Sequence, residues 1–282
     1  MSVLSAVDVR KRYGDVAALD GFDLDVGEGR IVGLIGPNGS GKTTALNALL
    51  GLNQIDSGTM EVLGLDPQRE RAALMEQVAY IADTGILPKW MRVRDLLAYA
   101  RDVHPHFHMD AALERLSRTD VRLDKKVRVL SKGMHVQLHL AIILAIDARL
   151  LVLDEPTLGL DIIYRQNFYD AVLNDYFHDQ RSILVTTHEV REIEHILTDV
   201  VFIHRGRARL AVATADIPER FVKLTAAQNV ALPTEPLSKR KTLAGMEFIF
   251  ADTPRESLAE LGELSTPNVP ELFVAIVEHD HV

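Results

Sequence analysis

Short hydrophobic runs alternate with segments of helical character along most of the chain. Residues 31–35 and 150–153 are apolar runs of the length that a buried strand requires, and residues 162–177 place apolar side chains at helical spacing. Residues 42–50 have helical composition and stop at Gly51, which favours a helix end there. Further strands are predicted at residues 3–9, 22–26, 59–63, 78–82, 183–186 and 200–204. This alternation predicts a mainly parallel sheet covered on both faces.

The pattern becomes helical between residues 85 and 145 and changes again near Thr214. Three helices are predicted in the first of these regions, at residues 93–101, 109–117 and 131–146. Beyond Thr214, residues 225–241 are richer in Pro, Ala, Thr and Lys. One strand and one short helix are predicted after that, at residues 246–250 and 269–277. We therefore expect residues 214–282 to form a small accessory segment.

Composition narrows the class of protein. The 282 residues are 47% hydrophobic and 25% charged, as in a globular protein with a sizeable core, and the net charge of −9 argues against a nucleic-acid partner. Without cysteine there is no disulfide framework and no thiolate metal site. We expect no signal peptide, and the most apolar stretch, residues 138–153, is too short and too polar to span a bilayer. A membrane role would therefore require a partner.

A glycine-rich segment follows the predicted strand 31–35 and matches the phosphate-binding loop pattern. It consists of Gly36, Pro37, Asn38, Gly39, Ser40, Gly41, Lys42 and Thr43, and Thr44 comes next. Glycines let backbone N–H groups turn toward phosphate oxygens, and the following helix directs the positive end of its dipole at them. Lys42 can reach the terminal phosphates, and Thr43 offers a hydroxyl to Mg²⁺. The segment predicts ATP binding; a glycine turn without a ligand is the alternative.

Two carboxylates end the predicted strand at residues 150–153. Asp154 and Glu155 would emerge at the carboxyl edge of the sheet, where open α/β sheets bind ligands. Asp154 is suited to hold Mg²⁺, and Glu155 is suited to act as the general base for an attacking water. A solvated acidic turn is the alternative, which the upstream phosphate loop disfavours.

Over residues 3–212 the chain resembles the nucleotide-binding subunits of ATP-binding cassette (ABC) transporters. The segment Leu130-Ser131-Lys132-Gly133-Met134 is similar to the family's signature motif, Leu-Ser-Gly-Gly-Gln in its usual form. The resemblance implies that two subunits pack head to tail, so that Ser131 and Gly133 of one chain contact the γ-phosphate held by the other. A hydroxyl, a bare backbone N–H and a helix N-terminus all favour an anion.

The resemblance implies further roles. Tyr13 would stack on adenine, Asp161 would belong to a loop that crosses the dimer interface, and His188 would bond the γ-phosphate. For Tyr13 an exposed strand-end tyrosine is the alternative. Three segments are similar to ATPases that serve type-2 exporter permeases, namely residues 131–134, 202–207 and 269–273.

Four positions depart from the family pattern: Lys132 and Met134 replace the usual glycine and glutamine of the signature, Gln137 replaces an arginine, and Asp83 is the fourth. Asp83 stands where the family usually carries a glutamine that contacts Mg²⁺ or the attacking water. A carboxylate there is able to ligate Mg²⁺ or water, and it would repel the γ-phosphate unless a cation screens it. The alternative is that Asp83 only caps a helix or turn.

The resemblance implies an α/β P-loop NTPase core with a mainly parallel sheet and an antiparallel β subdomain. The ATPase domain would span residues 1–213, with a helical subdomain inserted at about 84–146, and the accessory segment would follow. We expect an ATPase that uses ATP and Mg²⁺, pairs with an identical or related subunit and powers transport through a separate permease at the cytoplasmic face of the inner membrane. A soluble ABC-type ATPase and an ATP-gated regulatory module are the alternatives.

Overall fold

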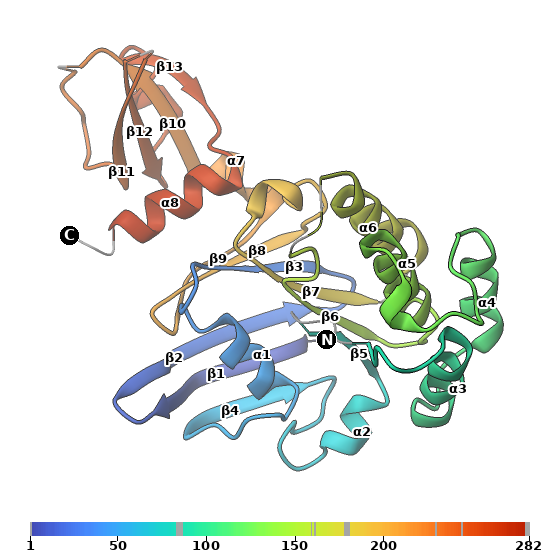
Figure 1. The fold of residues 1–282 in the computed structure, drawn as a ribbon. Coiled ribbons are helices and arrows are strands. Elements are labelled where there is room, and N and C mark those ends of the chain that lie inside the picture. The colour runs from blue at the N-terminus through green and yellow to red at the C-terminus, as the bar shows by residue number, and fades with distance from the viewer. Residues whose placement is uncertain are drawn as a thin grey trace.

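The computed structural model describes residues 2–82, 87–158, 160, 162–177, 181–228, 230–243 and 245–279. Its centre is a six-stranded sheet with the strand order β5-β6-β7-β3-β8-β9, in which only β9 runs antiparallel to its neighbour (Figure 1). Its strands are β3 (Ile31–Ile35), β5 (Val78–Ile81), β6 (Leu150–Asp154), β7 (Ser182–Thr187), β8 (Asp199–His204) and β9 (Arg207–Ala213). The predicted parallel sheet is therefore confirmed.

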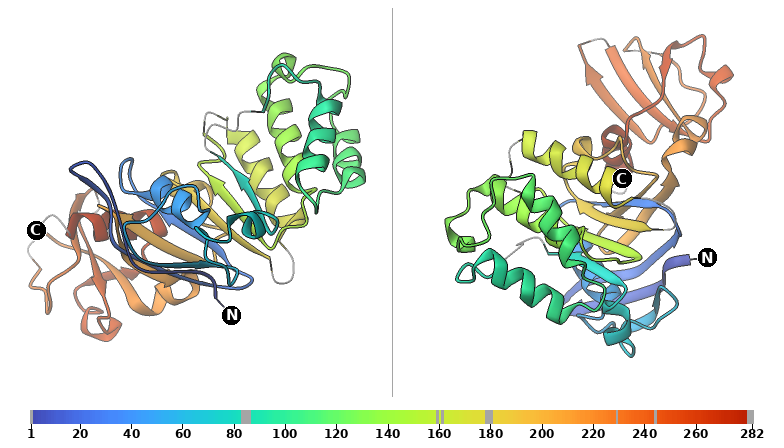
Figure 2. Two further views of the ribbon diagram at one scale, coloured as in Figure 1. Left: turned by 90° about the horizontal axis from the view of Figure 1, so that it is seen from below. Right: turned by 90° about the vertical axis from the view of Figure 1, so that its right-hand side faces the viewer.

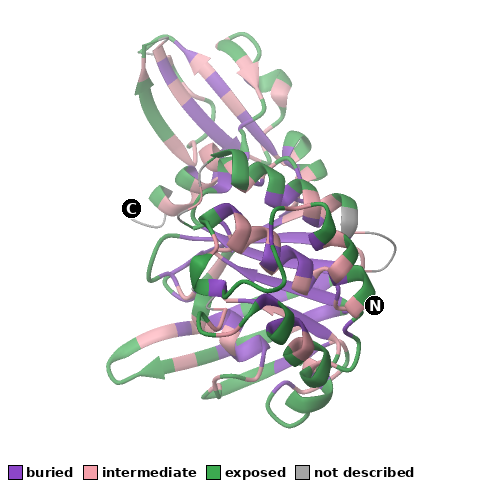
Figure 3. Ribbon diagram, turned by 45° about the vertical axis from the view of Figure 1, so that its right-hand side comes forward, coloured by how far each residue is buried: buried purple, intermediate pink, exposed green. Residues whose placement is uncertain are grey.

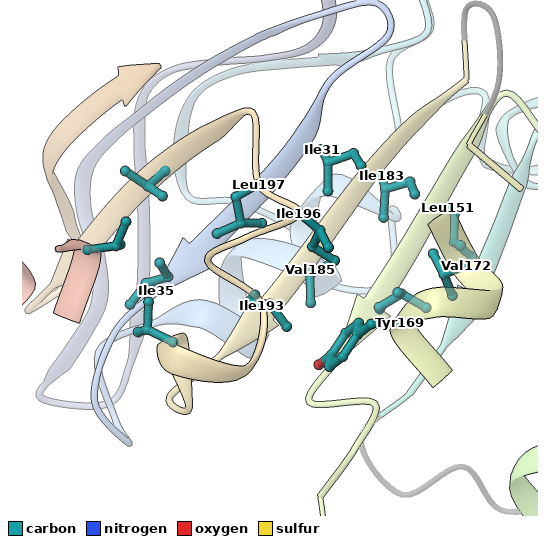
Figure 4. Packing of buried hydrophobic residues seen from close by; sticks show 14 of the residues in the cluster. Ile31, Ile35, Leu151, Tyr169, Val172, Ile183, Val185, Ile193, Ile196 and Leu197 are labelled. Atoms are coloured by element: carbon teal, nitrogen blue, oxygen red, sulfur yellow. The ribbon is translucent and has the colours of Figure 1, made fainter. Parts of the chain in front are cut away.

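The side chains of the central strands contribute alternately to two hydrophobic cores, one on each face of the sheet, because successive residues of a strand point to opposite faces. Ile31 and Ile183 pack with Val172 of α6 (Ile162–Asp175) on one face (Figure 4). The adjacent strand residues Val32 and Leu184 point to the other face, where they join the cluster around α1 (Lys42–Leu49). Helices thus cover the apolar strands on both sides.

A three-stranded antiparallel sheet completes the second core. Its strand order is β2-β1-β4, with β1 (Ser2–Tyr13), β2 (Val16–Gly27) and β4 (Ser57–Val62). Phe22 and Leu4 of this sheet share a buried cluster with Leu46 of α1. The short helix α2 (Arg71–Met75) follows β4. The expected antiparallel subdomain is confirmed.

A helical lobe lies beside the central sheet and extends away from it (Figures 1 and 2). It contains α3 (Val93–Val103), α4 (Met109–Ser117), the 3-10 turn η1 (Val127–Val129) and α5 (Lys132–Ile143). The lobe has its own buried cluster, to which Leu97, Leu116 and Leu138 contribute one side chain from each α-helix. The predicted inserted helices are present, and the third is shorter than the expected 131–146.

The C-terminal part forms a second antiparallel sheet, with the strand order β11-β12-β10-β13. Its elements are η3 (Thr214–Asp216), α7 (Ile217–Arg220), β10 (Phe221–Ala226), β11 (Ser238–Thr242), β12 (Gly245–Ala251), η4 (Arg255–Ser257), β13 (Gly262–Ser265) and α8 (Val269–His279). Figure 3 shows buried and partly buried residues along β10 and β12, whereas the edge strand β11 is mostly exposed. The sequence predicted only β12 and α8 here. The polar edge strand β11 and the four-residue β13 lack an apolar repeat, whereas β10 has one and was not predicted.

Helix α8 attaches this sheet to the core of the central sheet. Leu272 and Ala275 are buried in the same cluster as the central strands, and the Phe273 ring meets Phe202 of β8 at 5.3 Å between centroids. Among the described residues, no helix combines the length and the apolar character needed to cross a bilayer.

Candidate nucleotide site

The glycine-rich loop joins β3 to α1 and has the backbone that its glycines permit. Gly39 and Gly41 have φ of +80° and +110°, a region that side chains disfavour. A Cβ on Gly41 would lie 2.5 Å from the carbonyl oxygen of Ala18. Only glycine fits there, so the loop's close approach to β2 explains this part of the sequence pattern.

The Lys42 ammonium is folded back onto its own loop. Nζ donates to the carbonyl oxygen of Gly36 at 2.7 Å and approaches that of Pro37 at 3.3 Å. Lys42 also lies 3.5 Å from Oε1 of Glu155, and its side chain is 6% exposed. A buried cation with only partial compensation is ready to receive an anion.

Glu155 stands between a cation and an imidazole. Its Oε2 and Nδ1 of His188 are joined by a hydrogen bond of 2.8 Å. The residue has φ of +46°, which is uncommon outside glycine and points to a locally constrained backbone. The sequence predicted each of these residues separately, and the structure brings Lys42, Glu155 and His188 together.

Asp154 is 1% exposed and lies at the end of β6. Parallel pairing places it opposite Thr186 of β7, whose Oγ1 donates to Asp154 Oδ1 at 2.5 Å. The backbone N–H of Glu155 donates to the same hydroxyl at 3.2 Å. Sequence reasoning assigned no role to Thr186, since only the strand register shows that it orients both carboxylate residues.

A cavity of about 510 Å³ opens over these groups. It is lined by Val16, Ala18, Asn38, Gly39, Gly41, Lys42, Thr43, Thr44, Glu155, Leu158 and His188. Ser40 lies next to it, with an Oγ that is buried and has no partner among the described residues. The lining combines glycine backbone, hydroxyls and a lysine, which are the groups that bind phosphate.

Magnesium ligands are few but suitable. Thr43 offers an exposed hydroxyl on the cavity wall, and Asp154 offers a carboxylate oriented by Thr186. The described residues contain no cluster of three His, Cys, Asp or Glu side chains that would hold a metal ion. Such a sparse set of hard oxygen donors fits Mg²⁺, which commonly uses one or two protein ligands together with substrate phosphates and water.

Tyr13 lies at the rim of this region. It pairs with Val16 across the turn between β1 and β2, and Val16 lines the cavity. Its ring is 49% exposed, its hydroxyl accepts a hydrogen bond from Asn53 at 2.9 Å, and the Lys11 ammonium lies 5.5 Å from its centroid. Tyr13 does not itself line the cavity, but its exposed ring is of the kind that stacks on another planar ring.

The signature segment lies apart from this cavity and contributes none of its lining. Ser131 is the N-cap of α5, and its Oγ accepts a hydrogen bond from the Met134 backbone N–H at 3.2 Å. A Cβ on Gly133 would lie 2.5 Å from Cε1 of Tyr164 in α6. The Tyr164 ring thus packs closely over Gly133, a contact that the sequence did not reveal. Asp83 and Asp161 lie outside the described residues.

A glycine loop with its lysine and a carboxylate–histidine pair at the carboxyl edge of a parallel sheet define a P-loop ATPase. The ABC transporter family matches residues 19–158. The chain is 35% identical to "Nod factor export ATP-binding protein I" of Cupriavidus metallidurans over 73% of its length and 69% of that protein. It is also 28% identical to "Uncharacterized ABC transporter ATP-binding protein YdbJ" of Bacillus subtilis, over 99% of this chain and 88% of that one.

Solved structures agree with this result. "Structure of ATP binding subunit of ABC transporter" superposes with a TM-score of 0.68 at 25% identity, covering 76% of this chain and 91% of that one. An ATP-binding cassette in its ADP conformation, at 20% identity and a TM-score of 0.65 over 77% and 94% of the two chains, shows the same fold. The chain belongs to the ABC transporter family as an ATP-binding and ATP-hydrolysing subunit that powers transport.

Proposed function

We propose that the chain powers export through a separate membrane permease at the cytoplasmic face of the cell membrane. The names of two relatives bear on this proposal, one because it states export and the other because it states drug resistance. One is the Cupriavidus export protein, and the other is "Daunorubicin resistance ATP-binding protein DrrA2" of Streptomyces coeruleorubidus, 33% identical over 71% of this chain and 63% of that protein.

The observation that carries the proposed chemistry is the position of Glu155 between Lys42 and His188. ATP would draw Lys42 onto its terminal phosphates, which frees one carboxylate oxygen of Glu155. Glu155 then takes a proton from a water whose oxygen attacks the γ-phosphorus, and the bond to the bridging oxygen breaks to give ADP and phosphate. His188 lies beside the γ-phosphate and holds the carboxylate in place.

Thr43 and Asp154 are the residues proposed to hold Mg²⁺, with Thr186 orienting the carboxylate. When bound, the ion neutralises charge on the phosphate oxygens. Asp83 is proposed as a further ligand to the ion or the attacking water. The glycine-loop backbone and Thr44 bind the phosphates, and Tyr13 stacks on the base.

A second subunit, identical or closely related, is proposed to complete the site with its Ser131 and Gly133. An exposed apolar surface lies near the cavity, where Leu158, Ile162 and Ile163 are 58%, 78% and 67% exposed. Single chains rarely leave such large side chains clustered in water, so this surface is suited to burial against the second subunit. Asp161 is proposed to cross that interface.

The permease would dock in an apolar groove between the central sheet and the helical lobe. The groove has a volume of about 580 Å³ and is lined mainly by aliphatic and aromatic side chains, among them Met75, Tyr80, Leu87, Tyr99 and Val103. Tyr99 and Val103 are 55% and 62% exposed. Such a groove accepts the apolar face of a short helix. We retain residues 1–213 and 214–282 as the proposed division between ATPase domain and accessory segment.

Capture of the permease tests this assignment. Tagged chain is purified from detergent-solubilised membranes, and an integral membrane protein is expected with the wild type. Val103→Asp should abolish its recovery, whereas the matched change Val7→Asp, at a 55% exposed position on β1, should not. Equal recovery with Val103→Asp would rule out the groove, and absence of any integral membrane protein from the wild type would contradict the proposed transport role.

A further inference from the structure

Two neighbouring loops of the helical lobe form a basic surface on an acidic chain. Residues 87–94 and 120–130, named here the basic–tryptophan surface, contain seven basic and two acidic residues, although the whole chain carries −9. All seven basic side chains are exposed: Lys89, Arg92, Arg94, Arg122, Lys125, Lys126 and Arg128. None of these seven residues lines the nucleotide cavity of the same chain, so that cavity does not account for the local excess of positive charge.

Backbone hydrogen bonds hold the two loops together. The Val93 N–H donates to the Lys125 carbonyl oxygen at 2.9 Å, and the Val127 N–H donates to the Met91 carbonyl oxygen at 2.9 Å. The buried side chains of Val93 and Val127 anchor the pair in the core of the lobe. The charges are therefore displayed by a fixed scaffold.

The charges converge on one hollow of about 540 Å³. Five of the seven cations line it, together with two carboxylates, Val129 and two residues of the signature segment: Arg92, Arg122, Lys125, Lys126, Arg128, Asp120, Asp124, Leu130 and Met134. Asp124 pairs with Arg122 at 3.2 Å. Within the described residues Lys125, Lys126 and Arg128 form no ion pair, so most of this positive charge is available to an external anion.

Large apolar side chains stand beside these cations. Trp90 is 75% exposed and Val129 is 61% exposed. Trp together with Lys and Arg is the combination that occupies the membrane–water interface, where an amphipathic ring sits at headgroup level and cations meet lipid phosphates. The surface also adjoins the proposed permease groove, whose lining includes Leu87 and Pro88.

We propose that the basic–tryptophan surface binds the phosphate headgroups of anionic phospholipids and so orients the subunit against the membrane. The proposal rests on the proposed function only in placing a bilayer beside the groove. A free phosphate compound would need the cations but would leave Trp90 and Val129 exposed to water. A membrane surface accounts for both features: the cations meet lipid phosphates, and Trp90 and Val129 insert at the interface.

Trp90 is the only tryptophan of the chain, so the intrinsic tryptophan fluorescence reports on this surface alone. The full-length chain is mixed with vesicles of phosphatidylcholine alone or with about 30 mol% phosphatidylglycerol, and Trp90 emission and co-sedimentation are measured. A blue shift and sedimentation are expected with the anionic vesicles only, and both should weaken as salt is raised.

Lys125→Glu with Lys126→Glu should lower the vesicle affinity roughly tenfold or more. The matched control is Lys239→Glu with Lys241→Glu, which makes the same change in net charge on the exposed strand β11 and should bind as the wild type does. A normal far-ultraviolet circular dichroism spectrum establishes that each variant is folded.

Three results would overturn the proposal: no response of the wild type to anionic vesicles, equal loss in both double variants, or the same blue shift with inorganic phosphate alone. The first would leave an acidic protein segment as the alternative partner. Vesicle binding uses the chain without a permease. Its failure is therefore distinguishable from failure of permease capture, which would count against the transport role and not against lipid binding.

Discussion

The Nζ of Lys42 lies 3.5 Å from Oε1 of Glu155, so the lysine of the phosphate loop and the residue assigned as general base are paired with each other before nucleotide arrives. Both side chains are mostly buried, which strengthens their attraction relative to water. ATP binding must exchange this contact for one with phosphate. In the proposed mechanism, recruitment of Lys42 by ATP and release of Glu155 for catalysis are therefore the same event.

Lys42→Ala should weaken ATP binding by about 10- to 100-fold, since hydrogen bonds to charged groups are among the stronger ones. The variant also leaves Glu155 without its cation, so it should hydrolyse ATP slowly even when saturated. Equilibrium binding of a fluorescent ATP analogue measures the first effect. Lys241→Ala, at an exposed position on β11, is the control with the same loss of charge. Wild-type affinity in Lys42→Ala would remove the basis for the phosphate site.

Thr186→Val should raise the Mg²⁺ concentration needed for half-maximal ATPase activity and reduce turnover about tenfold. The substitution removes the donor to Asp154 while keeping the side-chain volume, and it leaves a buried carboxylate with one partner fewer. Thr186→Ser retains the hydroxyl and should restore the wild-type Mg²⁺ dependence. If Val and Ser behave alike, the hydroxyl does not position Asp154.

His139 on α5 should make the chain less stable in mild acid. Burial and the neighbouring His135 lower the pKa of His139 from 6.5 to about 4. The unfolded chain therefore takes up the proton first, and stability is lost as the pH falls from about 6.5 toward 4. His139→Gln should remove roughly 1–2 kcal/mol of the difference in unfolding free energy between about pH 7.5 and pH 5, measured in urea. The exposed His195→Gln should keep the wild-type difference.

Much of the ATPase core could be predicted, because its signals are local. The apolar run at β3, the glycine loop and the start of α1 are contiguous in sequence. At β6, likewise, an apolar run is followed directly by its two carboxylate residues. Pairing between strands that are far apart in the chain has no such local pattern in the sequence. The contact of Thr186 with Asp154 depends on the register of β6 and β7, and that of Tyr164 with Gly133 depends on how α6 lies against α5.

The accessory sheet was the least predictable part. β11 has the sequence Ser-Lys-Arg-Lys-Thr, and its exposed lysines suit an edge strand. Because it has no apolar residues, hydrophobic alternation cannot predict it. The strand becomes recognisable only when β12 is seen beside it, with Lys239 opposite Phe248. Helix α8, by contrast, could be predicted from the sequence, because Leu272 and Ala275 recur at helical spacing.

The most direct test of the account is the hydrolysis rate of Glu155→Gln, measured beside ATP retention by the same preparation. The amide keeps the side-chain shape but cannot accept the proton of the attacking water. We predict turnover at least about 100-fold below the wild type, with ATP bound and held in an associated pair of subunits. Hydrolysis by Glu155→Gln at the wild-type rate would contradict the assignment of Glu155 as the base and, with it, the proposed mechanism.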